Sequence, residues 1–392
     1  MGQTFPAERD TKRAVLLAAV ESLRDVLTAH ADEAETLGTL PSVTVDALKT
    51  ARLLALKLPA VLGGAEADPV TQIDTLEAVT RIDTSAGWCT MIGAAALGWP
   101  SAFLDNEAIA HVFAESDLPT AAGTFRPAGT AVPVAGGYRV TGRWGFASGI
   151  RHAQWTLAGT RVVRDNDSPP ELRMVIFPTR EAHMYDNWQV AGLQGTGSCD
   201  FAVTDLFVPE IFTWDMMGAQ PQRGGPLYHI GLPGLVTNEH AAFALGAGQQ
   251  ALDVIMAQAP SKERGLRQQA PLASRPVIQR AVGACDLRLR AARALVREIH
   301  EEAWTTVCEG RTPSAQLQAH MRSVAAFATE VAAEVVTCIF RYLGGSALYR
   351  SHTLQRCLRD INAAAQHALV SDVAYEIHGQ FALGLPGATP MG

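Results

Sequence analysis

The sequence predicts an α+β protein in three parts: an N-terminal helical domain (residues 1–118), a central β domain (119–224) and a C-terminal four-helix bundle (225–392). Two observations lead to this order. In the first and last parts, apolar residues recur every three or four positions, which is typical of amphipathic helices. In the middle part, short alternating runs are separated by glycine and proline, which is typical of strands and turns.

In the N-terminal part, Ala14–Leu27 has apolar residues at helical spacing, and Ser42 is the expected N-cap of a second helix over Val43–Leu54. Residues 84–104 carry no charged side chain and are about long enough to cross a bilayer. This stretch is interrupted by Gly87, Gly93, Gly98 and Pro100. We therefore interpret it as buried helices beside a ligand pocket and not as a membrane span.

In the middle part, four runs predict strands: Tyr138–Thr141, Trp155–Leu157, Met174–Phe177 and Phe201–Val208. The turns expected around them lie at Pro127, Gly129, Pro133, Gly136, Gly137, Gly142 and Gly149. The polar, proline-containing stretch Asp165–Pro170 predicts a surface hairpin loop.

In the last part, long alanine-rich segments predict four helices: His240–Ala257, Arg275–Val307, Ser314–Leu343 and Ser351–Gly379. Gly344 and Gly345 are a helix-ending signal directly after the third of them. Four long helices with short connections predict a bundle.

Composition narrows the function. The net charge is −7 without a Lys/Arg run, which indicates neither a nucleic-acid nor a membrane partner. The six cysteines never form CxxC, so we expect no metal site and reduced thiols in the cytoplasm. The N-terminus predicts an amphipathic helix and not a signal peptide. Only 18% of residues are charged, which favours subunits that bury faces against each other.

Three motifs carry the chemistry. The first is Gly142–Gly149 followed by His152–Trp155. The second is Gly192–Ser198 followed by Asp205–Pro209, and the third is Leu343–Gly345 followed by Arg359-Asp360. Taken alone, the first motif also fits an ordinary hairpin with core aromatic residues. The Arg-Asp pair taken alone also fits a solvated pair on a helix, which contributes little to stability.

Together with the order of the three parts, these motifs resemble the acyl-CoA dehydrogenase superfamily over nearly the whole chain. The resemblance implies that Ser148 hydrogen-bonds a flavin, and that a neighbouring subunit of a homotetramer brings Gly344 and Gly345 to the flavin tail. The other implied flavin contacts are Trp144, Phe146, Gly149, Gly197, Ser198, Arg359, Gln366 and a phosphate-binding arginine, Arg267 or, in another register, Arg264.

One departure is decisive. In straight-chain acyl-CoA dehydrogenases a catalytic glutamate follows the Arg-Asp pair at a fixed offset, and that offset falls here on Ala368, which cannot abstract a proton. The nearest carboxylates, Asp372 and Glu376, lie about one and two helical turns further on. Gln366 and His367 directly precede Ala368, and this form resembles the reduced-flavin-dependent, two-component monooxygenase (hydroxylase) branch.

The resemblance implies an enzyme that takes reduced FAD or FMN from a separate flavin reductase and, with O₂, forms a C4a-hydroperoxyflavin to hydroxylate or epoxidise a small indole-like or phenolic ring. His367 either deprotonates a phenol or polarises an indole N–H, or it hydrogen-bonds the peroxide. Ser148 holds the hydrogen on flavin N5, and His152 is a weaker candidate. The expected wall of a water-excluding pocket is Trp88, Met91 and Phe125.

Three alternatives stay open. An acyl-CoA dehydrogenase or oxidase with its base on another helix would hold oxidised flavin tightly and be reduced by an acyl-CoA. A relative that oxidises amino-sugar nitrogens to N-hydroxy or nitroso groups would share the cofactor. A non-catalytic scaffold of this fold would give no oxygen-dependent product.

Overall fold

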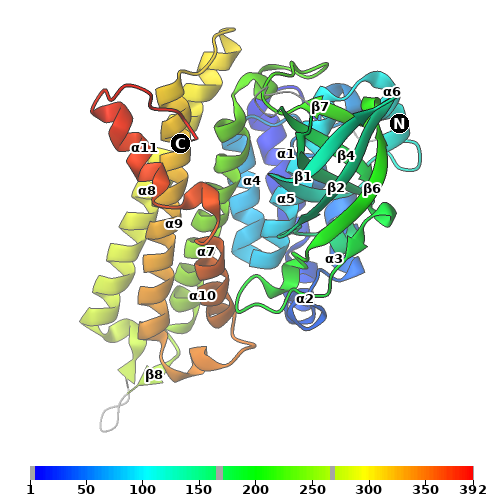
Figure 1. Ribbon diagram of the computed structural model, residues 1–392. Helices are drawn as coiled ribbons and strands as arrows, with labels where there is room; N and C mark the ends of the chain where they lie inside the picture. Colours follow the sequence, from blue (N-terminus) through cyan, green and yellow to red (C-terminus); the bar gives the residue numbers. More distant parts are fainter. Residues whose placement is uncertain (1–4, 165–170, 265–269, 392) are drawn as a thin grey trace. The chain divides into compact units, whose positions relative to one another are not determined.

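A computed structural model describes residues 5–164, 171–264 and 270–391 (Figure 1). The predicted loop Asp165–Pro170 and the predicted phosphate ligand Arg267 lie outside the described residues. The chain sorts into two compact units. The sheet unit comprises Met1–Ala67, Trp88–Gln189 and Gln194–His229, and the bundle unit comprises Asp68–Gly87, Val190–Leu193 and Ile230–Gly392. The predicted α+β class is confirmed, whereas the three residue ranges given for the domains stay a prediction.

The centre of the sheet unit is a seven-stranded sheet in the order β5-β6-β2-β1-β3-β4-β7 (Figure 1). Neighbouring strands are antiparallel except β1 and β3, which are parallel. The strands are β1 (Ala121–Val134), β2 (Gly137–Trp144), β3 (Trp155–Val162), β4 (Leu172–Pro178), β5 (His183–Met184), β6 (Phe201–Pro209) and β7 (Thr213–Asp215). All four predicted strand runs are confirmed, in β2, β3, β4 and β6.

Three residues predicted to form turns lie inside strand β1 instead. Pro127 and Gly129 occupy positions where the pairing of β1 with β3 shifts register. Such bulges accommodate proline, which has no N–H to donate to a sheet. Pro133 lies near the end of β1 opposite Tyr138. The turn predicted just beyond it, at Gly136, is confirmed, with φ 80° at that glycine.

The turn predicted at Gly142 is also wrong, because this residue lies within β2. A Cβ at Gly142 would stand 2.6 Å from the Gly129 Cα and 2.6 Å from the Trp144 ring. Glycine is therefore needed here for close packing between β1 and β2 and not for chain reversal. Gly149 does take the left-handed backbone of a turn, with φ 77°.

The sheet unit also contains the helices α1 (Arg9–Ser22), α2 (Arg24–Leu37), α3 (Ser42–Thr50) and α6 (Asn106–Val112). The single helix predicted over Ala14–Leu27 is wrong, because Leu23 ends α1 by donating its N–H to the Val20 carbonyl at 3.0 Å. The apolar spacing continues across this break, so periodicity alone does not reveal it. Pro41, with φ −59° and ψ 150°, holds the N-cap position predicted for Ser42.

Helix α5 (Thr84–Phe103) is continuous, although glycines and a proline were expected to interrupt it. Gly98 serves close packing: a Cβ there would lie 2.6 Å from the Lys57 Cβ. The lack of charged side chains in α5 follows from its burial, since most of its residues are enclosed.

The bundle unit contains α4 (Pro69–Ile82), α7 (Leu232–Gln258), α8 (Pro276–Cys308), α9 (Ala315–Leu343), α10 (Thr353–Ala364) and α11 (Val373–Ala382). The long helices α7, α8 and α9 pack side by side (Figure 1). Among the described residues, α9 is the helix long and apolar enough to cross a membrane, but 61% of its most apolar window is buried, as in the central helix of a bundle. It ends before Gly344, which has φ 81°, so the predicted helix end is confirmed.

The fourth predicted helix, Ser351–Gly379, is wrong as one helix. A short 3₁₀ turn, η10 (Ala368–Val370), separates α10 from α11. The backbone becomes extended at His367 (ψ 134°) and again at Ser371 (ψ 166°). The His367 side chain accepts the N–H of Leu369 at 3.3 Å, which competes with a helical carbonyl for that donor. His367 therefore lies in a turn and not on the face of a helix.

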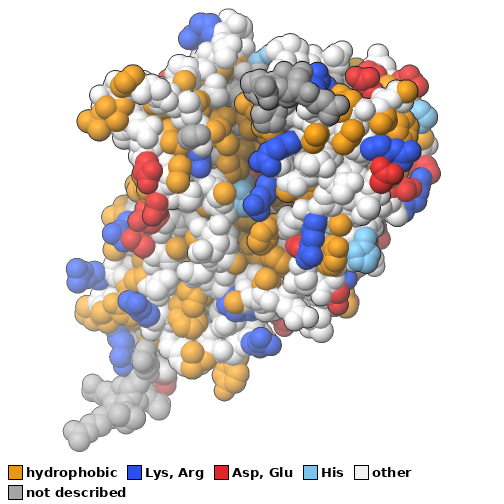
Figure 2. All heavy atoms as spheres, viewed as in Figure 1, with side chains coloured by type: hydrophobic (Ala, Val, Ile, Leu, Met, Phe, Trp, Pro, Cys, Tyr) orange, Lys and Arg blue, Asp and Glu red, His pale blue; other side chains and the backbone are white. Residues whose placement is uncertain are grey.

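Figure 2 shows one face of the molecule, on which basic and acidic side chains are scattered and hydrophobic side chains are exposed between them. The described residues of this face form no single extended basic surface.

Candidate functional site

Ser148 lies in a loop directly after β2. Phe146 and Gly149 flank it with φ values of 64° and 77°. The Gly149 N–H donates to the Thr196 carbonyl at 2.9 Å. These contacts fix Ser148 against the loop that contains the 3₁₀ turn η5 (Gln194–Thr196).

The hydroxyl of Ser148 belongs to a buried hydrogen-bonded chain. Trp88 Nε1 donates to Ser148 Oγ at 2.9 Å, and Ser148 Oγ lies 2.7 Å from Ser198 Oγ. Ser198 Oγ in turn lies 2.6 Å from Thr196 Oγ1. When Ser148 donates to Ser198, its oxygen keeps a second lone pair that can accept an N–H from a ligand. The structure thus unites three predicted residues, Trp88, Ser148 and Ser198, and adds Thr196, which sequence reasoning passed over although it lies within the second motif.

Two glycines shape the loops around these hydrogen-bonded hydroxyl groups. A Cβ at Gly149 would lie 2.9 Å from His152 Nε2, and a Cβ at Gly197 would lie 3.1 Å from the Gly38 carbonyl oxygen. Burial lowers the pKa of His152 to about 4. His152 Nδ1 has no hydrogen-bond partner among the described residues, so this ring is neutral at pH 7 and packs behind the loop.

The two aromatic residues predicted to contact the flavin are placed differently. Trp144 is 1% exposed, stacks on Phe201 with ring centroids 5.1 Å apart, and donates its Nε1–H to the Gly159 carbonyl at 2.7 Å. Phe146 is 70% exposed and meets Trp188 edge-on at 6.2 Å. Trp144 is thus a core aromatic of the sheet, and Phe146 is the ring that a planar ligand can reach.

The predicted pocket wall is spread along α5. Met91 is fully buried one turn beyond Trp88. Phe125 packs edge-on against Trp99, with ring centroids 4.4 Å apart. Since Trp99 comes 11 residues after Trp88, the two lie about 16 Å apart along the helix axis. A pocket that Trp88, Met91 and Phe125 line together stays a prediction.

In the bundle unit, contacts with Leu369 and His240 help to hold His367. Its Nδ1 accepts the Leu369 N–H at 3.3 Å, and its ring lies against the ring of His240 on α7, with centroids 4.3 Å apart and planes tilted by 41°. Burial lowers the pKa of His367 to about 4. His367 is therefore neutral at physiological pH. No motif in the sequence pointed to His240.

A buried arginine holds the turn that carries His367. Arg322 on α9 is 5% exposed. It donates to the carbonyls of Ala368 at 3.2 Å, Leu369 at 3.4 Å and Met391 at 2.7 Å. Burial lowers its pKa, though an arginine stays charged. One signal could have revealed it, since Arg322 is a charged residue in an apolar part of α9, with Met321 directly before it and Val324 two positions after it.

The Arg359-Asp360 pair is not solvated as a unit. Asp360 is fully buried, accepts the Leu193 N–H at 2.6 Å, and accepts the Thr84 hydroxyl. Arg359 donates to the Ala191 carbonyl at 3.2 Å. The pair therefore ties α10 to the segment 190–193, and the alternative of a surface pair is wrong for Asp360.

The remaining predicted residues lie at the edges of the bundle unit. Gly344 and Gly345 form the turn after α9, where a Cβ on Gly345 would meet nothing within 4 Å. Gln366 is exposed beside His367. Their predicted flavin contacts, like that of Arg359, stay predictions.

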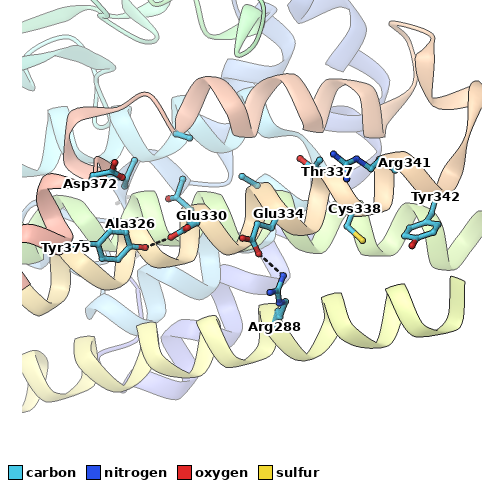
Figure 3. A pocket seen from close by; sticks show the side chains of 14 residues that line it. Arg288, Ala326, Glu330, Glu334, Thr337, Cys338, Arg341, Tyr342, Asp372 and Tyr375 are labelled. Carbon is cyan, nitrogen blue, oxygen red and sulfur yellow. Dashed lines mark hydrogen bonds and ion pairs between the residues drawn. The ribbon is translucent and has the colours of Figure 1, made fainter. Parts of the chain in front are cut away.

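A groove of about 940 Å³ runs along α9 (Figure 3). Ion-paired and hydrogen-bonded side chains line it: Arg288 Nη1 lies 2.7 Å from Glu334 Oε2, and the Tyr375 hydroxyl donates to Glu330 Oε2 at 2.7 Å. None of the described residues predicted for the site lines this groove. Among the residues that the structure describes, no three His, Cys, Asp or Glu side chains gather as metal ligands.

The residues around Ser148 and those around His367, in this fold, point to a class of protein. The family model for the acyl-CoA dehydrogenase C-terminal domain matches residues 239–372. The crystal structure of the HsaA monooxygenase from Mycobacterium tuberculosis superposes with a TM-score of 0.88 at 25% identity, over 97% of this chain and 100% of that one. XiaF from Streptomyces, in complex with FADH2 and glycerol, has the same fold, with a TM-score of 0.89 at 24% identity over 97% of each chain. The fold is that of the acyl-CoA dehydrogenase superfamily.

Relatives found by sequence indicate which branch of this superfamily the chain belongs to. The chain is 30% identical to indole-3-acetate monooxygenase of Pseudomonas putida over 347 residues, 88% of each chain. It is 29% identical to the oxygenase subunit HsaA of a flavin-dependent monooxygenase of M. tuberculosis, over 96% of this chain and 97% of the relative. The chain belongs to the flavin-dependent monooxygenases of the acyl-CoA dehydrogenase superfamily, in the two-component branch, and is an oxidoreductase. The family predicted from the motifs is confirmed.

Proposed function

We propose that this protein is the oxygenase component of a cytoplasmic two-component system. It is a homotetramer that uses O₂ and reduced FAD or FMN, supplied by a separate reductase, to hydroxylate or epoxidise a small indole-like or phenolic ring. The Pseudomonas putida relative is named for indole-3-acetate, and the XiaF structure holds FADH2, which supports both the ring class and the cofactor.

The observation that carries this proposal is a neutral, partly buried imidazole directly before the position where a dehydrogenase holds its carboxylate. Ala368 occupies the position expected for the base, and His367 directly before it is in contact with His240. A neutral imidazole can hydrogen-bond a phenol or an indole, but it is a weak base toward the α-proton of a thioester.

The sheet unit fits a reduced flavin. Bound reduced flavin would supply two electrons and the place where O₂ is activated. Ser148 Oγ, oriented by the Trp88 N–H, has a lone pair for a ring N–H, and Phe146 offers an accessible aromatic face. Holding that hydrogen in place would keep a proton from escaping and would slow the wasteful release of hydrogen peroxide.

The low pKa of His367 limits its role. A phenol with a pKa near 10 and an imidazole with a pKa of about 4 differ by roughly six units, or about 8 kcal/mol for complete proton transfer. This difference disfavours complete transfer of a phenol proton to His367 before the oxygen is transferred. His367 acts through a hydrogen bond to the substrate or to a bound peroxide.

The alternative of a dehydrogenase with a relocated base has a candidate base on α7. Glu239 on α7 is 1% exposed and is adjacent in sequence to His240. Neighbouring helical residues point about 100° apart, so Glu239 faces another direction than the ring that meets His367. A Glu239→Gln variant that keeps aromatic oxygenation would exclude Glu239 as the essential base.

The decisive experiment uses ¹⁸O₂. The protein is mixed anaerobically with photoreduced FAD or FMN and a panel of indoles and phenols, exposed to ¹⁸O₂, and the products are analysed by mass spectrometry. We expect one ¹⁸O atom in an aromatic product, with His367→Gln losing product while the flavin is still oxidised. Bleaching of flavin-loaded protein by an acyl-CoA without oxygen, and no labelled product, would overturn the proposal.

A further inference from the structure

The pair formed by His240 and His367 has a fixed arrangement of hydrogens. Nδ1 of His367 accepts the Leu369 N–H at 3.3 Å, so the neutral ring carries its hydrogen on Nε2. Nδ1 of His240 lies 2.9 Å from the Val236 carbonyl oxygen, which can only accept, so this ring carries its hydrogen on Nδ1. One backbone contact therefore fixes the tautomer of each ring.

The same contacts fix the position of His240. Its N–H is bonded to its own helix four residues back, and its side chain is 5% exposed. The His367 ring lies against it with centroids 4.3 Å apart. A ring held in this way keeps water from one side of His367, and loss of water disfavours the charged imidazolium.

We propose that His240 is a positioning residue that holds His367 as a neutral hydrogen-bond donor through Nε2, and not as a general base. This inference rests on the proposed function, and it selects one of the two roles that the sequence left open for His367. A donor at Nε2 would stabilise the negative charge that develops on the leaving oxygen of a bound peroxide when its O–O bond breaks and its other oxygen is transferred to the ring.

The charged groups around the pair are consistent with a neutral His367. Arg322 from α9 binds the carbonyls of Ala368 and Leu369, which places a positive charge beside the turn. A second positive charge on His367 would be repelled by it. Asp372 follows the turn and is exposed, and Glu239 points about 100° around α7 from His240.

The test compares His240→Gln with His300→Gln. His300 on α8 is a matched control, because it is also buried and its Nδ1 lies 2.8 Å from the Val296 carbonyl oxygen, the same i−4 contact as in His240. The first readout needs no flavin: ¹⁵N NMR of labelled histidine in the flavin-free protein, with the His367 signals assigned through His367→Gln.

We expect the wild-type His367 to show the neutral Nε2–H tautomer from pH 8 to about 5. In His240→Gln the pKa of His367 should rise by about one to two units toward 6.5, or its tautomers should mix, while His300→Gln leaves both unchanged. In turnover, His240→Gln should lower kcat about tenfold with little change in KM, less than the 10²–10⁴-fold typical of a lost acid or base.

His240→Phe keeps a ring against His367 and should retain the low pKa, which covers the case in which the glutamine variant does not fold. An Nδ1–H tautomer in the wild type, or NMR spectra of His367 that are the same in wild type and His240→Gln, would overturn the inference. Because these spectra are recorded without flavin, they stand even if no ring oxygenation is found, so the two failures are distinguishable.

Discussion

Replacing Arg322 by methionine tests whether the turn that carries His367 depends on a side chain from α9. Arg322 donates to Met391 at 2.7 Å and to Ala368 and Leu369 at 3.2 and 3.4 Å. The two long contacts contribute about 1 kcal/mol each and the short one about 1.5 kcal/mol. Methionine needs no desolvation of a charge, which offsets part of this loss. We expect the free energy of unfolding to fall by about 2–3 kcal/mol.

The measurement is urea unfolding followed by circular dichroism at fixed protein concentration, since subunit association would shift the midpoint. The control is Arg290→Met on α8, whose exposed side chain forms a 3.8 Å pair with Asp286. That variant should lose less than about 0.5 kcal/mol. Arg322→Met should also lower kcat more than it changes KM, because Arg322 contacts the backbone of the turn that orients His367. Equal stability of the two variants would refute the reasoning.

Three further predictions follow from the geometry. Ser148→Ala removes the hydroxyl acceptor that Trp88 orients, so a larger share of the reduced flavin should be reoxidised with release of hydrogen peroxide, measured in a peroxidase-coupled assay. Ser148→Thr retains the acceptor and serves as the control. Equal release of hydrogen peroxide by the two variants would contradict the role given to the hydroxyl. Gly149→Ala and Gly136→Ala both place alanine at positive φ, 77° and 80°, but of the two only Gly149→Ala brings a Cβ within 2.9 Å of His152 Nε2. In urea unfolding, Gly149→Ala should therefore lower the free energy of unfolding by at least about 1 kcal/mol more than Gly136→Ala. Similar losses would show that the loop rearranges to accept the Cβ. Burial lowers the pKa values of His152 and His367 to about 4, so their contribution to stability is complete above the unfolded value of about 6.5 and is lost as pH falls toward 4. The urea midpoint should therefore fall between pH 7.5 and pH 4.5 in the wild type, and it should fall less in His367→Gln. Identical slopes of midpoint against pH would contradict the pKa shift of His367.

The fold class could be predicted because periodicity reports burial directly. Strands such as Phe201–Val208 and the apolar face of α9 bury one side of a regular element, and their sequences alternate with the matching period. Glycine and proline were less reliable, because they carry two meanings. Gly136 marks a turn, whereas Pro127 marks a bulge and Gly142 a close contact, both inside strands.

The break between α10 and α11 could not be predicted from propensity. The segment around His367 is rich in alanine, the best helix former, and nothing local opposes a continuous helix. The helix ends there because His367 accepts the Leu369 N–H and Arg322 binds the Ala368 and Leu369 carbonyls. These contacts come from another helix or from a particular side-chain orientation, and neither is visible in a window of sequence.

Some residues of the site lie in sequence motifs and others do not. Ser148 and His367 stand in motifs with characteristic spacing, so a resemblance could point to them. His240 lies 127 residues before His367 in an ordinary helix, and only folding brings the two rings together. His300 has a similar environment, because its Nδ1 also contacts a backbone carbonyl four residues back in its own helix. A buried histidine bonded to its own backbone is therefore not informative by itself, and the contact with His367 is what distinguishes His240.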